Sequence, residues 1–206
     1  MIEVHHLNNS RSQRILWLLE ELAIPYEIVR YQRDPQTNLA PPELEAIHPL
    51  GKSPVIRDGA RVVIESGAII DYLVRRHGRG RLAPPETSPE YDTYQQWLHY
   101  AEGSAMLPLM LKLYLSRLGE AGAPLAPRVD GEIERHMGFL DAQLEDRDYF
   151  LGSELSAADV QLSFPIQVTR ALYGLEKFSN LAAFLERITA RPAYQRALER
   201  GGAYGL

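Results

Sequence analysis

The segment IEVHHLNNSRSQRILWLLEELAIPYEIVRY (residues 2–31) contains two different hydrophobic periodicities. Apolar and polar residues alternate in IEVHHL (2–7) and in YEIVRY (26–31), which is typical of β-strands. Between them, SQRILWLLEEL (12–22) carries apolar residues at helical spacing, namely Ile15, Leu16, Leu18, Leu19 and Leu22. The segment is therefore predicted to be a βαβ unit, in which a helix connects two parallel strands.

The next part of the chain adds a hairpin and another helix to this unit. The predicted elements are a short helix in PPELEAI (41–47), strands in PVIR (54–57) and RVVI (61–64) around an Asp58-Gly59 turn, and a helix in ESGAIIDYLVRRHG (65–78). The order βαβαββα predicts a mixed sheet of about four strands with helices on its faces, because parallel crossovers need helices and hairpins need only turns. Residues 1–78 are interpreted as one small α/β domain.

The rest of the chain is predicted to be helical. Residues 79–89 are rich in glycine and proline and have almost no periodicity, which is typical of a linker. Residues 90–206 are interpreted as an all-helical domain. Pro108 lies inside its long helical pattern, so a kink or a break is expected near Leu107. The predicted helical segments are 90–118, 128–147, 156–173 and 180–200, the last split by Pro192.

The composition of the 206 residues is that of a soluble globular protein, with 45% hydrophobic and 24% charged residues. A formal net charge of −5, with Lys and Arg scattered, argues against nucleic acid as a partner. No apolar run approaches the roughly 20 residues needed to span a bilayer, and the start MIEVHHLNN lacks the features of a signal peptide, so the cytoplasm is the expected compartment. The chain has no cysteine, so any thiol chemistry must use a thiol that is brought in.

Four motifs, in this order, resemble the glutathione transferase superfamily. They are HLNNSRSQRILWLLEELAIPYEI, similar to its first strand, active-site turn and first helix; HPLGKSPVI (48–56), similar to its peptide-binding loop; ESGAIIDYL, similar to the start of its third helix; and LSAADVQLSFP, similar to its C-terminal capping motif. The resemblance covers essentially the whole chain and is nearest to the bacterial and fungal branch with NNSRSQR after the first strand. It implies a thioredoxin-like N-terminal domain, an all-α C-terminal domain and a homodimer.

The loop HPLGKSPVI corresponds in this family to the binding site for the glutathione backbone. A cis bond between Ser53 and Pro54 would bend the chain so that Ser53 presents its N–H and C=O outward, where an extended tripeptide could dock. Lys52 supplies a cation suited to the glycyl carboxylate of glutathione, and Gly51 lets the loop approach closely. The structural alternative is an edge-strand proline beside a solvated lysine.

Glu65 and Ser66 come directly before an apolar helical pattern, so the Ser66 hydroxyl and the first backbone N–H groups of that helix point at one spot. Such a place suits a carboxylate. The family resemblance implies that the γ-glutamyl end of glutathione lies here, with its carboxylate on Ser66 and its ammonium near Glu65. A plain helix cap with an acidic first turn would explain both residues without a ligand.

The group that stabilises the glutathione thiolate is expected in the turn between the first strand and the first helix. The pKa of a free cysteine thiol is about 8.5, so the bound sulfur needs a donated hydrogen bond to ionise at neutral pH. Ser10 is the first assignment because it lies just ahead of the helix; in the competing interpretation it caps the helix and Gln13 completes S-x-x-Q. Asn9 is the alternative donor. Ser12 and Arg11 are further candidates, and Ser12 is also expected to contact glutathione.

The apolar residues on one stretch of the long helix are candidates for the electrophile pocket, since in this family that helix faces the glutathione sulfur. Core packing is the alternative for all of them. They are Met106, Leu107, Met110, Leu111 and Tyr114.

Other polar residues are interpreted as structural. In SAAD (156–159), Ser156 at the N-cap and Asp159 at the third helical position can cap each other, which would fix where an apolar helix begins. His5 and His6 are adjacent on a strand, so they face opposite sides and cannot chelate one metal ion. No metal site is expected.

The sequence is therefore interpreted as a glutathione transferase that conjugates the glutathione thiolate to small apolar electrophiles, a detoxification activity. Glutathione is a substrate in this interpretation, and no cofactor is expected. Two alternatives stay open: a glutathione-dependent peroxidase or disulfide reductase, in which glutathione again supplies the attacking sulfur, and a protein that binds glutathione or another ligand without turnover.

Overall fold

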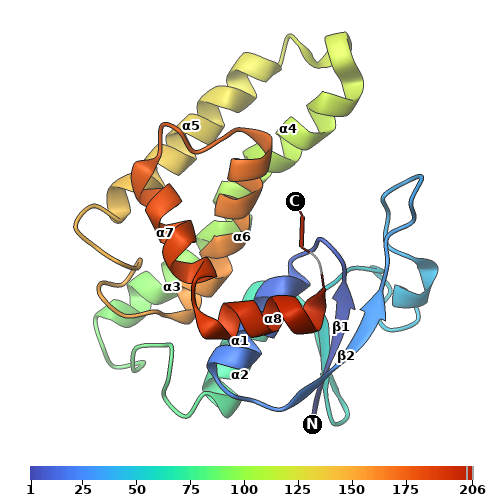
Figure 1. Ribbon diagram of the computed structural model, residues 1–206, viewed down its shortest axis with the longest axis vertical. Helices are drawn as coiled ribbons and strands as arrows, with labels where there is room; N and C mark the ends of the chain where they lie inside the picture. Colours follow the sequence, from blue (N-terminus) through green and yellow to red (C-terminus); the bar gives the residue numbers. More distant parts are fainter. Residues whose placement is uncertain (203, 206) are drawn as a thin grey trace. The chain divides into compact units, whose positions relative to one another are not determined.

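The computed structural model describes residues 1–202, 204 and 205. It divides into two compact units, one formed by Met1–Leu82 together with the chain from Thr189 onward, the other by Ala83–Ile188. Figure 1 shows the β-sheet in the first unit and an all-helical second unit. The combination of a thioredoxin-like domain and a helical domain is confirmed.

The sheet of the first unit is mixed and has four strands in the order β2-β1-β3-β4. β1 is parallel to β2 and antiparallel to β3, and β3 is antiparallel to β4. The predicted βαβ start and the hairpin after it are therefore confirmed. The strands are β1 (Ile2–Leu7), β2 (Tyr26–Tyr31), β3 (Val55–Asp58) and β4 (Arg61–Val63).

Two helices of the first unit follow the sequence pattern, α1 (Ser12–Glu21) and α2 (Ser66–His77). The predicted helix at 41–47 is only a 3₁₀ turn over Pro42–Leu44. Leu44 is the one buried residue of that turn, so no apolar face is left whose burial would stabilise a longer helix.

The compact units divide the chain differently from the predicted domain boundaries, because the last helix does not group with the helical unit. α8 (Pro192–Gly201) packs along α1 in the first unit, and Figure 1 shows the two helices side by side. The Trp17 and Tyr194 rings meet edge to face, with 5.3 Å between their centroids. Pro192 starts α8 at a position where proline fits a helix, which separates it from the preceding helical pattern.

The second unit is built around α6, in which every residue from Ala157 to Thr169 is buried. α3 and α4 both contact α6, and α4 also contacts α5. Among the described residues, no helix has both the length and the apolar character needed to cross a membrane. The helices of this unit are α3 (Glu90–Tyr100), α4 (Met106–Leu118), α5 (Ala126–Gln143), α6 (Ala157–Leu172) and α7 (Ser179–Thr189).

The long helical pattern 90–118 is interrupted upstream of the predicted position. A π-helical turn, Ala101–Ala105, separates α3 from α4, whereas Pro108 lies inside the first turn of α4. The expected irregularity is therefore present, but it lies a few residues upstream of Leu107. Proline lacks the N–H that would bond the carbonyl four residues earlier and clashes with that carbonyl, and the wider π turn directly before α4 accommodates this mismatch.

The start of α6 is fixed by the predicted capping box between Ser156 and Asp159. Asp159 Oδ2 accepts hydrogen bonds from Ser156 N (2.7 Å) and Ser156 Oγ (2.6 Å), and Asp159 Oδ1 accepts one from Phe150 N (2.8 Å). The carboxyl group is fully buried. Burial raises the pKa of Asp159 to about 6, although these donated hydrogen bonds lower it.

Candidate functional site

The turn between β1 and α1 is held by a pair of buried hydroxyl groups. Ser10 Oγ lies 2.7 Å from Ser12 Oγ, and it donates a hydrogen bond to the Leu7 carbonyl at 2.8 Å. It also accepts the Ser12 backbone N–H at 3.2 Å. Ser10 precedes the helix cap, which is Arg11, so the structure does not use Ser10 as the N-cap. The Ser10 hydroxyl has one proton, and the turn itself offers it acceptors.

A histidine lies behind this pair. His6 Nδ1 is 2.8 Å from Ser12 Oγ, and the His6 ring also makes a hydrogen bond to the backbone of Gly201 at the end of α8. Burial lowers the pKa of His6 to about 4, so the ring is neutral at physiological pH. Sequence reasoning did not connect His6 to the turn or to Gly201, and the second contact depends on how α8 folds back onto α1.

Asn9 is a partly exposed residue of the turn, next to the buried Ser10. Its backbone has φ +49°, a left-handed conformation that asparagine tolerates better than most residues. Asn9 Oδ1 accepts the Gly205 N–H at 3.0 Å, and its backbone carbonyl accepts Arg33 Nη2 at 3.1 Å. The oxygen of the side-chain amide is therefore engaged, which leaves the amide NH₂ as the donor that a ligand could use.

Arg33 is a residue of this site that the sequence did not suggest. Besides Asn9, its side chain reaches the Asn8 carbonyl with Nε at 3.2 Å, while its backbone N–H donates to Asn8 Oδ1 at 2.9 Å. Burial and the nearby Arg11 charge lower the pKa of Arg33. A signal for it existed, because Arg33 follows β2, and the carboxyl ends of parallel neighbours β1 and β2 lie at the same edge of the sheet.

The loop before β3 is bent at a cis peptide bond between Ser53 and Pro54, as predicted. The β1–β3 ladder ends at the His5–Val55 pair. Beyond it the Ser53 hydroxyl, not its backbone, contacts β1: Ser53 Oγ donates to the His5 carbonyl at 2.8 Å and accepts the Leu7 N–H at 3.3 Å. Within the described part of the chain, neither the N–H nor the C=O of Ser53 has a hydrogen-bond partner.

Two neighbours of Ser53 have the properties that the sequence suggested. Lys52 is exposed, and no carboxylate of the described residues pairs with it. Gly51 has φ +55° and is buried, and a Cβ there would lie 2.8 Å from Glu45 Cγ. A side chain at this position would strain the backbone and displace the Glu45 side chain, so glycine is favoured there.

Ser66 is buried as the first residue of α2, and Glu65 before it is exposed with φ +64°. The guanidinium of Arg14, a buried residue of α1, donates from Nη2 to Ser66 Oγ. Arg14 is a second residue that sequence reasoning missed, because it lies on a helix face surrounded by apolar residues. A cation, a hydroxyl and the N-terminus of a helix thus meet at Ser66, and each of the three favours an anion.

The structure brings the predicted glutathione residues together in the first unit. The Leu7 N–H links two of them directly, since it lies 3.3 Å from both Ser12 Oγ and Ser53 Oγ. Ser66 is joined to the same region through Arg14 on α1. Asn9, Ser10 and Pro54 belong to the two turns that Leu7 connects.

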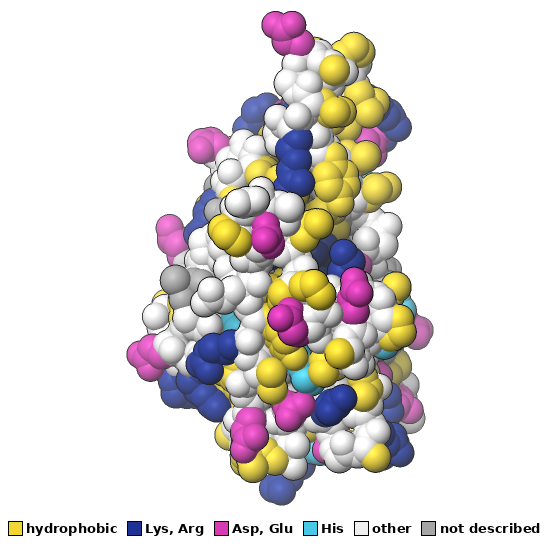
Figure 2. All heavy atoms as spheres, turned by 90° about the vertical axis from the view of Figure 1, so that its right-hand side faces the viewer, with side chains coloured by type: hydrophobic (Ala, Val, Ile, Leu, Met, Phe, Trp, Pro, Cys, Tyr) yellow, Lys and Arg dark blue, Asp and Glu magenta, His cyan; other side chains and the backbone are white. Residues whose placement is uncertain are grey.

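The five predicted electrophile residues lie on α4 in the second unit and differ in exposure. Met106 is 2% exposed and belongs to the core, whereas Leu107 is 61% and Tyr114 53% exposed. Leu111 is exposed as well, and Met110 is intermediate. Figure 2 shows exposed apolar side chains along the upper part of the face where Figure 1 places α4.

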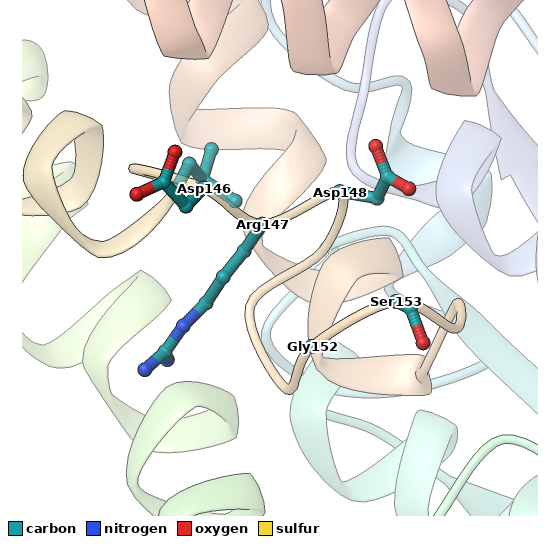
Figure 3. Close-up of a pocket in the computed structure, with 6 residues that line it drawn as sticks. Asp146, Arg147, Asp148, Gly152 and Ser153 are labelled. Atoms are coloured by element: carbon teal, nitrogen blue, oxygen red, sulfur yellow. The ribbon is translucent and has the colours of Figure 1, made fainter.

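A hollow of about 400 Å³ in the second unit contains none of the predicted site residues. Its labelled polar side chains point in different directions and do not converge on one point (Figure 3). Among the described residues no group of three His, Cys, Asp or Glu side chains could hold a metal ion. The lining residues of the hollow are Leu144, Asp146, Arg147, Asp148, Gly152 and Ser153.

Comparison with known proteins agrees with this geometry. Residues 10–76 match the family model for the glutathione S-transferase N-terminal domain, and residues 96–192 match the model for its C-terminal domain. The chain is 35% identical to glutathione S-transferase 3 of Schizosaccharomyces pombe, over 97% of this chain and 88% of that protein.

Two solved structures extend the comparison. A glutathione S-transferase from Actinobacillus pleuropneumoniae superimposes with a TM-score of 0.91 at 34% identity, covering 99% of this chain and 94% of the other. A family member from Pseudomonas fluorescens, solved with two glutathione bound, has a TM-score of 0.82 at 26% identity and covers 96% of this chain and 92% of its own. On this evidence, the chain belongs to the glutathione S-transferase family.

Proposed function

We propose that this protein conjugates the thiolate of glutathione to small apolar electrophiles. The observation that carries the proposal is the backbone of Ser53, whose N–H and C=O have no hydrogen-bond partner among the described residues and which lies beside the hydroxyl-lined turn after β1. An extended peptide can add its own backbone hydrogen bonds there, as in strand addition. The relative from Pseudomonas fluorescens, solved with two glutathione bound, supports glutathione as that peptide. The cytoplasm is the compartment that this substrate suggests.

Glutathione would lie across the first unit with each end on a charged or polar group. Its cysteinyl backbone pairs with Ser53, and its glycyl carboxylate meets the unpaired ammonium of Lys52. Its γ-glutamyl carboxylate takes the place at the start of α2, where Ser66 is backed by Arg14. The exposed Glu65 carboxylate receives the γ-glutamyl ammonium.

The sulfur would then point at the turn between β1 and α1. The Ser10 hydroxyl donates within the turn, whereas the Asn9 amide keeps its NH₂ for a ligand. We therefore assign the thiolate donor to Asn9 and a structural role to Ser10. The guanidinium groups of Arg11 and Arg33 add positive charge near the turn, which also favours the ionised sulfur.

The reaction is a nucleophilic displacement or addition. The thiol proton goes to solvent, the sulfur forms a bond to the electrophilic carbon, and with a halide substrate the carbon–halogen bond breaks and halide leaves with its electrons. The protein contributes orientation and stabilisation of the thiolate. The exposed apolar residues of α4 support an apolar class of electrophile, with Leu107, Leu111 and Tyr114 as the proposed contacts.

A homodimer is a further part of the proposal. The exposed apolar surface of α4 is longer than a small electrophile needs, because it extends as far as Leu118, which is 59% exposed. Leu118 lies one turn beyond the residues assigned to the electrophile, so the helix of a second copy of the chain can cover it without filling that site. Light scattering of the protein, with Leu118→Glu as the comparison, tests this assembly.

Steady-state assays test the activity itself. Chlorodinitrobenzene with glutathione should be turned over with release of chloride, and turnover should be absent without glutathione. Activity confined to a hydroperoxide or to a mixed disulfide would contradict conjugation. Calorimetric binding of glutathione without turnover of any of the three substrates would leave only a binding function.

Lys52→Ala is expected to raise the KM for glutathione several-fold and to leave kcat nearly unchanged. The reason is that Lys52 contacts a part of glutathione far from the reacting sulfur, so its loss removes binding that is equal in the ground state and the transition state. Lys177→Ala is the matched control, since Lys177 is an exposed lysine of the other unit paired with Glu134. A KM that matches wild type in both variants would mean that Lys52 is merely solvated.

A further inference from the structure

His6 is a buried polar side chain of the first unit to which the proposed chemistry gives no task. Its ring contacts the active-site turn on one side, through Ser12 Oγ at 2.8 Å, and the end of α8 on the other, through the Gly201 backbone. These two contacts join segments of the chain that are far apart in sequence.

The directions of these hydrogen bonds follow from the chemistry of the partners. The contact with the Gly201 backbone favours the protonated ring nitrogen, so Gly201 contributes its carbonyl and His6 donates to it. In the neutral ring the other nitrogen, Nδ1, carries no proton and accepts the Ser12 hydroxyl proton. Ser12 Oγ is then an acceptor toward the Leu7 N–H and toward Ser10 Oγ, 2.7 Å away, so the one Ser10 proton is shared between Ser12 Oγ and the Leu7 carbonyl. His6 thereby determines which group donates and which accepts in the hydrogen bonds of the turn.

Gly201 allows α8 to come close enough for this contact. A Cβ at Gly201 would lie 2.5 Å from Gln13 Oε1 and 2.8 Å from Leu16 Cδ1, and both of these α1 side chains are buried. A larger residue would therefore displace these buried side chains or push the end of α8 away from α1. The helix is fixed nearby by Arg200, whose guanidinium pairs with Glu20 at 3.0 Å.

We infer that His6 is a positioning residue, which fastens the thiol-binding turn to the end of α8 and orders the Ser10–Ser12 hydroxyl pair. The inference rests on the proposed function, because the turn is the proposed site of the thiolate. His6 does not touch glutathione in this arrangement. It acts through Ser12 and Ser10, whose hydrogen bonds hold the backbone on which the Asn9 amide is presented.

The test compares His6→Leu with His6→Asn and with His5→Leu. Leucine fills the space without an acceptor, while asparagine can offer an acceptor near the position of Nδ1. We expect His6→Leu to lower kcat about 10-fold and to move the rising limb of kcat against pH upward, with the glutathione KM changed less than about 2-fold. His6→Asn should recover most of the rate.

His5→Leu is the matched control, because His5 is buried on the same strand but bonds Tyr31 through Nδ1 at 2.9 Å. Its ring lies on the opposite side of β1 from the His6 ring. This variant should have a lower melting temperature than wild type and an unchanged rising limb of kcat against pH. Gly201→Ala, which displaces the other end of the link, should reproduce the pH shift of His6→Leu.

A measurement without glutathione separates the two proposals. Amide hydrogen exchange of the free protein should show faster exchange at Ser12 and Gln13 in His6→Leu than in wild type, because both amides bond to Ser10. If His6→Leu leaves both the amide exchange of Ser12 and Gln13 and the rising limb of kcat against pH unchanged, the proposed role of His6 is overturned. Wild-type protein that does not bind glutathione would instead overturn the proposed function, whatever the exchange rates show.

Discussion

Asp159→Ala is expected to lower the free energy of unfolding by about 3–5 kcal/mol, because it leaves buried donors without an acceptor. Phe150 N, Ser156 N and Ser156 Oγ all donate to this carboxyl group, at 2.6 to 2.8 Å. Each orphaned donor keeps the cost of leaving water and loses the bond that compensated it. Urea unfolding followed by circular dichroism measures the change.

Asp148→Ala is the control for this substitution. Asp148 is also in the second unit, but its side chain is 55% exposed and pairs with Arg187 at 3.0 Å. An exposed ion pair of this kind contributes less than about 1 kcal/mol. Equal unfolding midpoints for Asp159→Ala and Asp148→Ala would show that the capping box does not stabilise the start of α6.

The protonation of Asp159 also makes stability depend on pH. Its pKa is raised by burial to about 6 in the folded protein, from 3.8 for a free side chain. Between these values the unfolded chain releases the proton and the folded chain keeps it, so this group favours folding below about pH 4, and its contribution is lost as the pH rises through about 6. Asp159→Asn removes the titration. The stability difference between wild type and this variant should therefore shrink from pH 4 to pH 6 in urea unfolding curves.

The sheet and its helices could be predicted because their signals are local. The strands predicted at 2–7 and 26–31 coincide with β1 and β2, because the strand signal lies in the residues of each segment itself, although β1 is buried on both faces. The π turn before α4 could not be predicted in the same way. Its place depends on how α3 and α4 both meet α6, whereas Pro108 indicates only that a mismatch must be absorbed nearby.

The candidate site likewise contains residues that local sequence signals predict and residues that they do not. Ser53, Pro54 and Ser66 stand out in the sequence because a proline at the start of a strand and a serine at the start of a helix are local signals. Arg14 and His6 do not stand out in the sequence, because each acts through a residue of another element. In the case of His6, one partner is Gly201, which comes close only because α8 packs against α1. A helical pattern reports which face is apolar, but it does not report which other helix that face will cover.

The two candidate thiolate donors differ in the hydrogen bonds that they already make. Ser10 Oγ accepts the Ser12 backbone N–H, and its one proton already has two acceptors inside the turn, the Leu7 carbonyl and Ser12 Oγ. Asn9 is bonded through Oδ1 to the Gly205 N–H. Removing Ser10 should therefore disturb the turn, while removing the Asn9 side chain should remove a donor that a ligand uses.

Asn9→Gly is expected to reduce turnover of chlorodinitrobenzene about 10- to 100-fold. This is the effect of losing one hydrogen bond to a charged sulfur, which contributes roughly 1.5–3 kcal/mol. Glycine is the informative replacement because Asn9 has φ +49°, where alanine would add backbone strain to the lost donor. Without the donor the pKa of bound glutathione rises, so the rising limb of kcat against pH should move to higher pH. Ser10→Ala should instead lower the melting temperature with a smaller shift of that limb. If Ser10→Ala loses the rate and shifts the limb while Asn9→Gly does neither, the thiolate donor is Ser10, and its bond to the Leu7 carbonyl is exchanged for one to the sulfur when glutathione binds.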